Sequence, residues 1–184
     1  NKESIEATKL LKDAWFKVVA HMMPNLLGST PDLDRKALKE VFDNSDFRPD
    51  ELKIYPMMVT NNSELTEVWK QWKFKAYDDE TLIDLTADLQ TMIPEYIRLN
   101  RTYRDIPSEM VLEWSHLSNL RQLVEAKLKK EWRKLIDIRH REIKEKLNDP
   151  KRAVLNTYEY EASWWKEYFM TFEDKEDRTI FSLL

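Results

Sequence analysis

The sequence predicts an α/β fold in which short strands alternate with amphipathic helices. Residues 16–20, 51–55 and 96–103 are short apolar or β-rich segments that predict strands. Between them, apolar residues recur at helical spacing, as in the segment 80–92. Strands that alternate with helices in this way form βα units, and βα units build parallel sheets. We therefore expect a parallel sheet covered by helices.

The segment from residue 2 to residue 29 predicts a helix, a strand and a loop. Apolar residues at helical spacing indicate the helix over 2–14. The apolar run at 16–20, with two adjacent valines, is typical of a strand covered on both faces. The loop 21–29 leaves the carboxyl end of that strand, where α/β proteins bind ligands. An ordinary strand-to-helix connection is the simpler interpretation of the spacing alone.

The helices that follow each have a start signal. Thr30 and Pro31 fit the N-cap and the first position of a helix over 32–43. A second helix is expected over 63–73, with Ser63 as its N-cap. A third is expected over 80–92, with Asp78 or Asp79 as its N-cap. Each of these helices presents apolar side chains on one face, which we expect to pack against the sheet.

The character of the chain changes after residue 107. Residues 119–147 are expected to be largely helical and are strongly basic, although the whole chain carries a net charge of −4. Residues 158–172 then alternate in the manner of an antiparallel strand and are rich in aromatic side chains. A basic helical connector followed by the start of a second sheet is the organisation we expect.

The composition limits the class of protein. With 42% hydrophobic and 35% charged residues, the 184-residue chain is typical of a folded globular protein. The sequence contains no apolar run of the roughly 18–20 residues that a membrane helix needs, and no basic-then-apolar leader, so we expect a cytoplasmic protein. Cysteine is absent, which excludes disulfides and thiolate metal sites. The missing initial methionine and the apolar last residues suggest that both ends are cut.

The loop after the first strand carries a specific resemblance. HMMPNLLGS at 21–29, followed by Pro31, resembles the Elongator catalytic-subunit family, in which this stretch reads close to HMMPGLPGS-x-P. Asn25 and Leu27 depart from a glycine and a proline of that pattern. Four further stretches agree in the same order: FRPDELKIYP at 47–56, RTYRDIP at 101–107, SNLRQL at 118–123 and YEYEASWWKEYFMTFEDKED at 158–177.

The resemblance implies a fold and an activity for the whole enzyme. The family joins a radical-SAM barrel to an acetyltransferase-like domain and adds a carboxymethyl group to the wobble uridine of tRNA, with S-adenosylmethionine, a 4Fe-4S cluster and acetyl-CoA. By this resemblance, residues 1–107 are the later βα units of a partial (β/α) barrel, 108–157 a basic helical connector and 158–184 the first strands of an α+β acetyltransferase-like domain. The cluster cysteines would lie upstream, so this fragment alone is expected to be inactive.

The resemblance also implies cofactor-binding residues at the open end of the barrel. His21, Met22 and Met23 follow one strand, and Lys53 and Tyr55 share one face of the next strand because they are two residues apart. By resemblance these five border the pocket for S-adenosylmethionine and the nucleotide. The ordinary alternatives are a buried, hydrogen-bonded histidine and methionines that fill gaps in the core.

Basic residues form a candidate tRNA-binding set. Their positive charge suits the phosphate backbone of RNA without reading its sequence. A solvated helix face with i,i+4 ion pairs is the ordinary explanation. The residues are Arg101, Arg104, Lys127, Lys130, Arg133, Arg139 and Arg141. The resemblance implies an ion pair between Arg104 and Asp105 near the substrate opening.

Asp137 and His140 lie where the family carries a cysteine-rich zinc motif. One aspartate and one histidine are too few for a structural zinc site, which takes four nitrogen or sulfur ligands. We therefore predict no metal at this place, and the sequence indicates no catalytic residue elsewhere.

Two other functions stay open. One is a non-catalytic α/β-helical module that binds RNA or a protein partner through its basic helix. The other, a protein-lysine acetyltransferase, depends on the last 27 residues alone. The sequence does not indicate which further Elongator-like subunits, if any, are partners.

Two residue counts are abnormal. The chain has one glycine, Gly28, and seven tryptophans, whereas average composition would give roughly 13 glycines. Six of the tryptophans fall where the related family has, or would accept, glycine: Trp15, Trp72, Trp114, Trp132, Trp164 and Trp165. Trp69 matches a family tryptophan. Our hypothesis is that the six are glycines in the living protein, encoded by UGA, and the alternatives are true substitution or redesign.

Overall fold

The computed structural model describes residues 2–61, 63–103, 108–113, 119–144 and 149–184. The helices are α1 (Lys2–Asp13), α2 (Pro31–Asp43), α3 (Leu65–Lys70), α4 (Asp79–Thr91), α5 (Leu120–Lys130) and α6 (Ile138–Arg141). The strands are β1 (Val19–Met22), β2 (Glu51–Ile54), β3 (Val59–Thr60), β4 (Arg98–Arg101), β5 (Val111–Glu113), β6 (Ala153–Ala162), β7 (Trp165–Asp174) and β8 (Ile180–Leu183).

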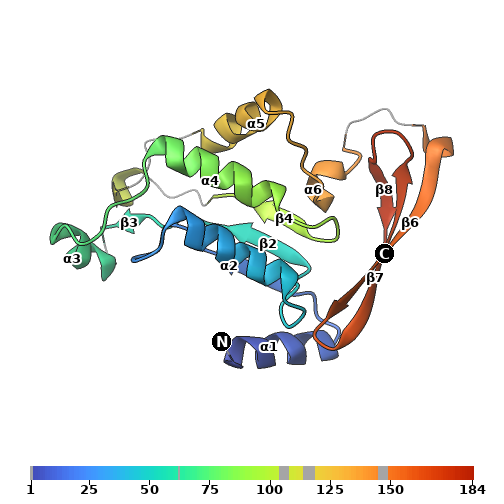
Figure 1. The fold of residues 1–184 in the computed structure, drawn as a ribbon, viewed down its shortest axis with the longest axis horizontal. Helices are drawn as coiled ribbons and strands as arrows, with labels where there is room; N and C mark the ends of the chain where they lie inside the picture. The colour runs from blue at the N-terminus through green and yellow to red at the C-terminus, as the bar shows by residue number, and fades with distance from the viewer. Residues whose placement is uncertain (1, 62, 104–107, 114–118, 145–148) are drawn as a thin grey trace.

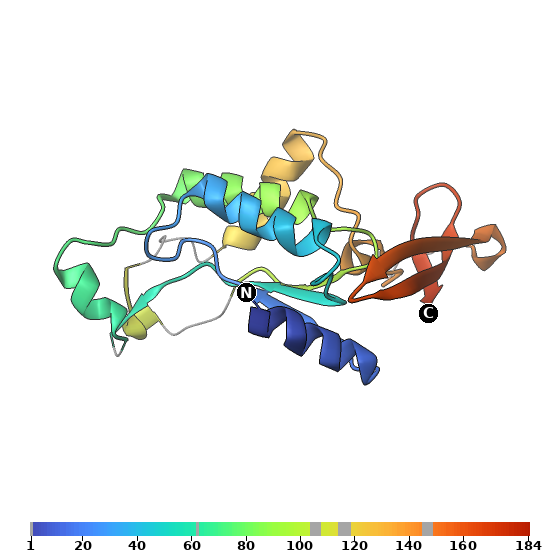
Figure 2. The ribbon, with the colours of Figure 1, turned by 60° about the horizontal axis from the view of Figure 1, so that its bottom comes forward.

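The first sheet is parallel, with the strand order β1-β2-β4. Helices α2 and α4 lie together on one side of this sheet, and α1 lies on the other side (Figures 1 and 2). Parallel strands joined by helices are the arrangement that the alternation of elements predicts, and the α/β class is confirmed.

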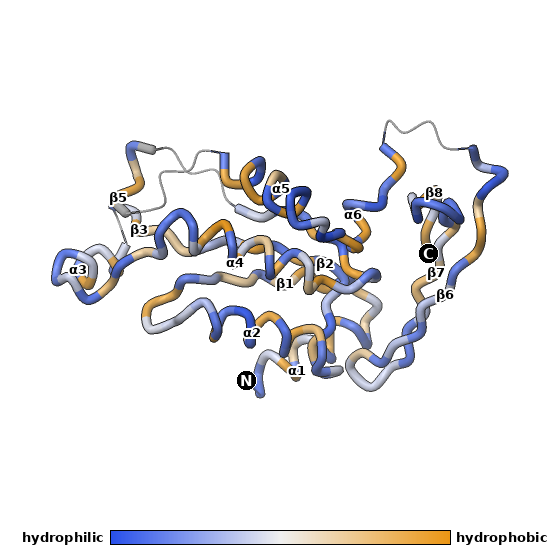
Figure 3. The backbone as a smooth tube through the Cα atoms, turned by 45° about the horizontal axis from the view of Figure 1, so that its top comes forward, coloured by the Kyte–Doolittle hydropathy of each residue, from blue (hydrophilic) through white to orange (hydrophobic). Residues whose placement is uncertain are grey.

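The main hydrophobic core lies between α2, α4 and the covered face of the first sheet. Leu52 and Ile54 of β2 and Leu85 of α4 are fully buried there, and Leu38 of α2 is 1% exposed. In the hydropathy colouring of Figure 3, α2 and α4 alternate between polar and apolar segments, as amphipathic helices do. Thr30 caps α2 through its side chain and Asp78 caps α4, as two of the start signals predict.

The first strand differs from its prediction. It covers Val19–Met22 rather than 16–20, and it lies at the edge of the sheet with one face exposed rather than covered on both faces. Residues 16–18 connect to other elements instead: the Phe16 amide bonds the Leu11 carbonyl at the end of α1, and the Val18 amide bonds the Asp50 carboxylate. The apolar run at 16–20 therefore does not form a strand that is buried on both faces of the sheet.

Two helices are shorter than predicted. The helix expected over 63–73 is α3, Leu65–Lys70, and its N-cap is Glu64 rather than Ser63. The segment expected to be largely helical over 119–147 divides into α5 and the short α6. In both cases the helix ends before a tryptophan with positive φ, Trp72 or Trp132, which stops the helical path.

Two antiparallel sheets complete the fold. The sequence did not indicate the small pair of β3 and β5. The larger sheet, β6-β7-β8, projects from one end of the molecule (Figure 1). Its strands β6 and β7 form a long hairpin in which every residue from Ala153 to Ala162 is paired. The antiparallel character predicted for 158–172 is confirmed, with a turn at Ser163 and Trp164 between the two strands.

Candidate functional site

Three of the five predicted cofactor residues meet on the face of the parallel sheet that is turned away from α2 and α4, the side on which α1 lies. Leu52 and Ile54 point into the core, so Lys53 points to the opposite face. His21 of β1 is the register partner of Lys53. The His21 and Tyr55 rings meet edge to face, with their centroids 5.6 Å apart and an interplanar angle of 89°. This face thus presents a cation and two polar rings side by side.

Two further polar residues extend this face. Glu51 lies two residues before Lys53, and Asn100 of β4 donates a hydrogen bond of 2.6 Å from its side-chain amide to the Glu51 carboxylate. Sequence reasoning missed both residues. Their signal was the same two-residue alternation that placed Lys53 and Tyr55 on one side of β2. We refer to His21, Glu51, Lys53, Tyr55 and Asn100 as the open polar face.

The methionine pair does not join this face as a unit. Met22 packs against the hydrophobic core, on the side covered by the helices, because it alternates with His21 along β1. Met23, in the following loop, is 46% exposed. The position of Met22 therefore fits the alternative interpretation, in which a methionine fills a gap in the core.

The loop after β1 is held by a buried polar network that the sequence did not reveal. Asp34 accepts hydrogen bonds from the Asn25 backbone amide (2.9 Å), the Ser29 hydroxyl (2.6 Å) and the Tyr77 hydroxyl (3.0 Å). Burial and the neighbouring Asp34 carboxylate raise the pKa of Tyr77 to about 12, so this hydroxyl stays a donor. Asn25 has a φ of 68°, a conformation that asparagine tolerates better than most residues. This network fixes the path of the loop between β1 and α2.

Basic side chains gather around a hollow at the carboxyl end of β4. The hollow has a volume of about 400 Å³ and its lining includes Arg101, Arg121, Arg139, His140 and Tyr103, together with one carboxylate, that of Glu125, which pairs with Arg121 at 2.8 Å. Of these, Arg101 and Arg139 belong to the predicted tRNA-binding set. Because Arg121 and Glu125 lie on α5 and the other residues follow or face β4, the fold joins two distant parts of the chain here. We call Arg101, Arg121, Arg139, His140 and Tyr103 the basic hollow.

Two other predicted basic residues tie α5 and the residues directly after it to α4. Lys127 forms ion pairs of 2.9 Å with Asp84 and 2.6 Å with Glu131, which together raise its pKa. Arg133 binds Asp88 at 2.8 Å and the Thr91 hydroxyl at 2.6 Å. Ion pairs of this kind, including the i,i+4 pair of Lys127 and Glu131, are what the simpler explanation of the basic segment, a solvated helix face, requires.

The remaining members of the set are distributed differently. Lys130 is exposed on the last turn of α5. Arg141 is 5% exposed and binds the Glu173 carboxylate, the Ile136 carbonyl and the Glu95 carbonyl, so its guanidinium is not available to a phosphate. Arg104, with its expected partner Asp105, lies outside the described residues.

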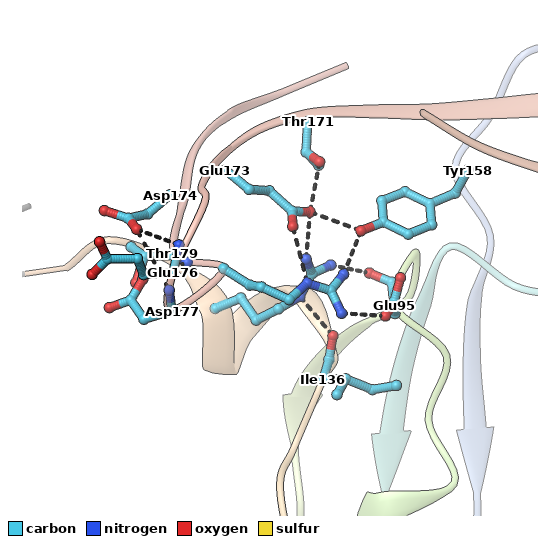
Figure 4. Close-up of polar contacts among 11 residues, drawn as sticks. Glu95, Ile136, Tyr158, Thr171, Glu173, Asp174, Glu176, Asp177 and Thr179 are labelled. Carbon is cyan, nitrogen blue, oxygen red and sulfur yellow. Dashed lines mark hydrogen bonds and ion pairs between the residues drawn. The ribbon is translucent and has the colours of Figure 1, made fainter. Parts of the chain in front are cut away.

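Arg141 belongs to an ionic network between the two larger sheets. Figure 4 shows this network and labels its members Glu95, Tyr158, Thr171 and Glu173. Glu173 of β7, fully buried, accepts hydrogen bonds from Arg141, from the Thr171 hydroxyl (2.6 Å), from the Tyr158 hydroxyl (3.1 Å) and from Arg178 (3.2 Å). Arg178 also binds Glu95 at 2.7 Å. Sequence reasoning missed this network, since Glu173 lies 32 residues from Arg141 and no local pattern links them.

The network lowers the pKa of both carboxyl groups. The hydrogen bond from Arg178 is the largest influence on Glu95 and lowers its pKa. Burial by itself would raise the pKa of Glu173, but the hydrogen bonds from Thr171 and Arg141 and the two arginine charges outweigh it and lower the pKa. Both groups are therefore ionised at neutral pH, and the buried charges are matched.

Asp137 and His140 have a local structural role. Asp137 is fully buried and caps α6, accepting hydrogen bonds from the Arg139 and Leu99 amides, and it contacts the His140 ring. Among the described residues, no group of three or more His, Asp or Glu side chains is arranged to hold a metal ion. With no cysteine in the sequence, this chain has no donor set for an iron–sulfur cluster. In the described part of the chain, no helix is both long and apolar enough to span a membrane.

Comparisons with known proteins identify relatives of the chain. A family profile described as the Radical_SAM C-terminal domain matches residues 49–130. All of the chain aligns at 38% identity with 35% of the tRNA uridine(34) acetyltransferase of Methanocaldococcus infernus, and 97% of it aligns at 38% identity with 33% of Elongator complex protein 3 of Danio rerio. The chain thus spans about a third of the length of these relatives.

A solved structure agrees with the sequence comparison. The archaeal Methanocaldococcus infernus Elp3 with an N-terminal deletion (1–46) superimposes on the whole chain with a TM-score of 0.94 at 38% identity, and 44% of that chain is covered. The fold and the sequence point to the same relatives, as the five ordered stretches predicted. The chain belongs to the Elongator catalytic-subunit family.

Proposed function

We propose that this chain is part of an enzyme that modifies the wobble uridine of tRNA. The relatives named tRNA uridine(34) acetyltransferase support this substrate. The finer proposal is that the intact enzyme adds a carboxymethyl group, with S-adenosylmethionine and acetyl-CoA as co-substrates. In that enzyme, residues 1–107 would complete the barrel, 108–157 would form the basic connector and 158–184 would begin the acetyltransferase-like domain.

The open polar face is the observation that carries this proposal. Its members His21, Lys53 and Tyr55 lie toward the carboxyl ends of β1 and β2, where α/β proteins bind ligands, whereas Glu51 begins β2. Lys53 offers a cation to the carboxylate of S-adenosylmethionine, and the adjoining His21 and Tyr55 rings offer surfaces on which a purine can stack. Glu51 and Asn100 add acceptors and donors for ribose hydroxyls.

This chain would position substrates rather than supply the radical. Its residues contain no thiolates for the cluster, which would come from another part of the enzyme. When bound, the cluster and S-adenosylmethionine supply a radical that can abstract hydrogen. The open polar face would hold the nucleoside portion in place.

The basic hollow would receive the phosphate backbone of the tRNA. Arg101, Arg121 and Arg139 carry guanidinium groups, which suit phosphate recognition, and the neighbouring Tyr103 ring offers a stacking surface. Arg121 pairs with Glu125 at 2.8 Å and Arg139 donates to the Asn100 carbonyl, so a phosphate would bind the remaining guanidinium donors of these two residues. Lys130 would add an exposed charge on α5. Arg141 is left out of this proposed set because its guanidinium is both buried and engaged by Glu173, whereas Arg121 is exposed.

Fluorescence anisotropy of a labelled tRNA with the 184-residue chain tests this proposal. Arg101→Ala and Arg121→Ala should each weaken binding and reduce the slope of log K against log salt by about 0.7–0.9, because each removes one phosphate contact. Lys2→Ala, on α1 across the sheet, is the matched control and should leave both quantities unchanged. Binding and salt slopes of both arginine variants equal to those of the Lys2→Ala chain would contradict the proposal.

A further inference from the structure

Four tryptophans occupy backbone conformations that suit glycine. Among the described residues, nine non-glycine residues have a positive φ, and four of these are Trp15 (62°), Trp72 (58°), Trp132 (56°) and Trp164 (74°). A side chain with a Cβ is penalised in this region, and for a bulky residue it is a genuine outlier. Gly28, the one glycine in the printed sequence, also has a positive φ, 82°.

Three of the four end helices in the same way. The Trp15 amide donates to the Lys12 carbonyl (2.9 Å) and the next amide, that of Phe16, to the Leu11 carbonyl (3.0 Å). These two bonds define a Schellman motif, in which the residue at the position of Trp15 is usually glycine. The same pair of bonds closes α3 at Trp72 (2.8 and 3.2 Å) and α5 at Trp132 (3.3 and 3.0 Å).

The fourth tryptophan lies in a two-residue hairpin turn. Ser163 and Trp164 connect the paired residues Ala162 and Trp165, and both turn residues have a positive φ, 49° and 74°. Two consecutive positive φ values characterise the type I′ turn, whose second position is typically glycine. This backbone conformation again favours glycine, the residue that has no Cβ.

The indole rings at these positions are hardly buried. Trp15, Trp72 and Trp132 are 91–94% exposed and Trp164 is 81% exposed, although a tryptophan side chain normally buries a large apolar area. Trp69, in contrast, is partly buried and packs against the cluster of Met57, Val59, Phe74 and Ala76. The strained tryptophans thus gain little packing that could offset their backbone cost.

We propose that positions 15, 72, 132 and 164 are glycines in the protein that the organism makes, encoded by UGA codons that a glycine-accepting tRNA reads. UGA differs from UGG, the tryptophan codon, in its third base alone, so translation of UGA as tryptophan produces the printed residues. The positive φ values, the helix-end hydrogen bonds and the hairpin turn support glycine at these four positions. Trp165 lies within β7 without a positive φ, and Trp114 lies outside the described residues, so the proposal does not include these two positions.

The coding sequence and the mass of the native protein give the first test. We expect UGA at codons 15, 72, 132 and 164, UGG at codon 69, and peptides from the source organism whose masses contain glycine at the four positions. UGG at the four codons, or tryptophan in those peptides, overturns the proposal.

The stability of variants gives an independent test of the backbone argument. In denaturant unfolding of the 184-residue chain, Trp15→Gly, Trp72→Gly and Trp132→Gly should each raise the folding equilibrium constant about five-fold, since a Cβ in this region costs roughly 1 kcal/mol or more. The matched control Trp15→Ala keeps the Cβ and should give little or none of that gain. A gain as large with alanine as with glycine would show that loss of the indole, and not the backbone, is responsible.

Trp69→Gly is the opposing control. It places glycine inside α3 and removes a ring from a packed cluster, so it should lower the folding equilibrium constant by at least five-fold. Destabilisation by glycine at positions 15, 72 and 132, in the same direction as at position 69, overturns the proposal. None of these outcomes depends on tRNA binding, so the proposed function can fail or succeed separately.

Discussion

The two larger sheets of this molecule are anchored by different forces. The parallel sheet β1-β2-β4 buries Leu52, Ile54 and Leu99 against α2 and α4, all at 2% exposure or less. The sheet β6-β7-β8 buries Glu173 and Thr171 almost completely, and these join an ionic network with Arg141. A smaller apolar cluster of Phe169 and Ile180 accompanies that network.

This difference has consequences for how each sheet is positioned. Apolar burial is non-directional and roughly proportional to area, so it stabilises a layer without fixing one orientation. Hydrogen-bonded ion pairs have strict geometry, and a buried charge that loses its partner is costly. We infer that the ionic network determines the orientation of β6-β7-β8 on the first sheet, and that the apolar core determines whether the first sheet folds.

Glu173→Ala should have the largest effect, about 3–5 kcal/mol, because it leaves the buried Arg141 guanidinium without its counter-charge. Urea unfolding measures the loss, and amide hydrogen exchange should locate it in β6, β7 and β8. Glu176→Ala is the matched control, since Glu176 is an exposed partner of Arg152 and its loss should cost about 0–1 kcal/mol. Equal costs for the two variants would refute the role given to the network.

Leu85→Ala should cost about 2–5 kcal/mol through the cavity it leaves in the main core. In contrast to Glu173→Ala, the increase in hydrogen exchange should begin in β2, β4 and α4. Leu10→Ala, at a side chain of α1 that is 69% exposed, is the control and should change stability by less than about 0.5 kcal/mol. If exchange first rose in β6-β8, the two sheets would share one core rather than two kinds of anchor.

The parallel sheet could be predicted from the sequence because its signals are local. The caps Thr30 and Asp78 lie within a few residues of the backbone groups they bind, and the alternation along β2 separates Leu52 from Lys53. The open polar face follows from the same period of two. Its further members, Glu51 and Asn100, could have been found by extending that alternation to both ends of the strands.

The second anchor could not be predicted in this way. Arg141 stands in a basic segment and differs from Arg139 in no local respect, yet one is buried and the other lines the basic hollow. The distinction arises from Glu173, which the fold brings beside Arg141 from a distant strand. The prediction of one long basic helix was wrong for a different reason. A tryptophan at residue 132 gives no signal that a helix ends, and the hypothesis that this position is glycine, which would give one, was not applied to this helix boundary.

The smallest expected effect is a selective sensitivity of the second anchor to acid. The pKa values of Glu95 and Glu173 are lowered from 4.5 in the folded chain. A carboxyl group whose pKa is lowered by folding contributes stability above its unfolded pKa, and this contribution is lost as the pH falls toward the folded value. We therefore expect β6-β7-β8 to lose hydrogen-exchange protection below about pH 4.5, ahead of the core strands β2 and β4.

Asp78, the cap of α4, also has a lowered pKa because it accepts a hydrogen bond from the Thr81 amide. Acid should therefore also weaken the N-terminal end of α4, in the first half of the chain. The variant Glu173→Gln separates the two contributions, since it keeps the shape of the side chain and removes its titration. In each protein, the hydrogen-exchange protection of β6-β7-β8 is measured as a function of pH, relative to its value at neutral pH. This protection should fall less steeply with decreasing pH in the variant than in the unmodified chain. The same pH profile in both proteins would mean that apolar contacts, as in the first sheet, hold the second sheet as well.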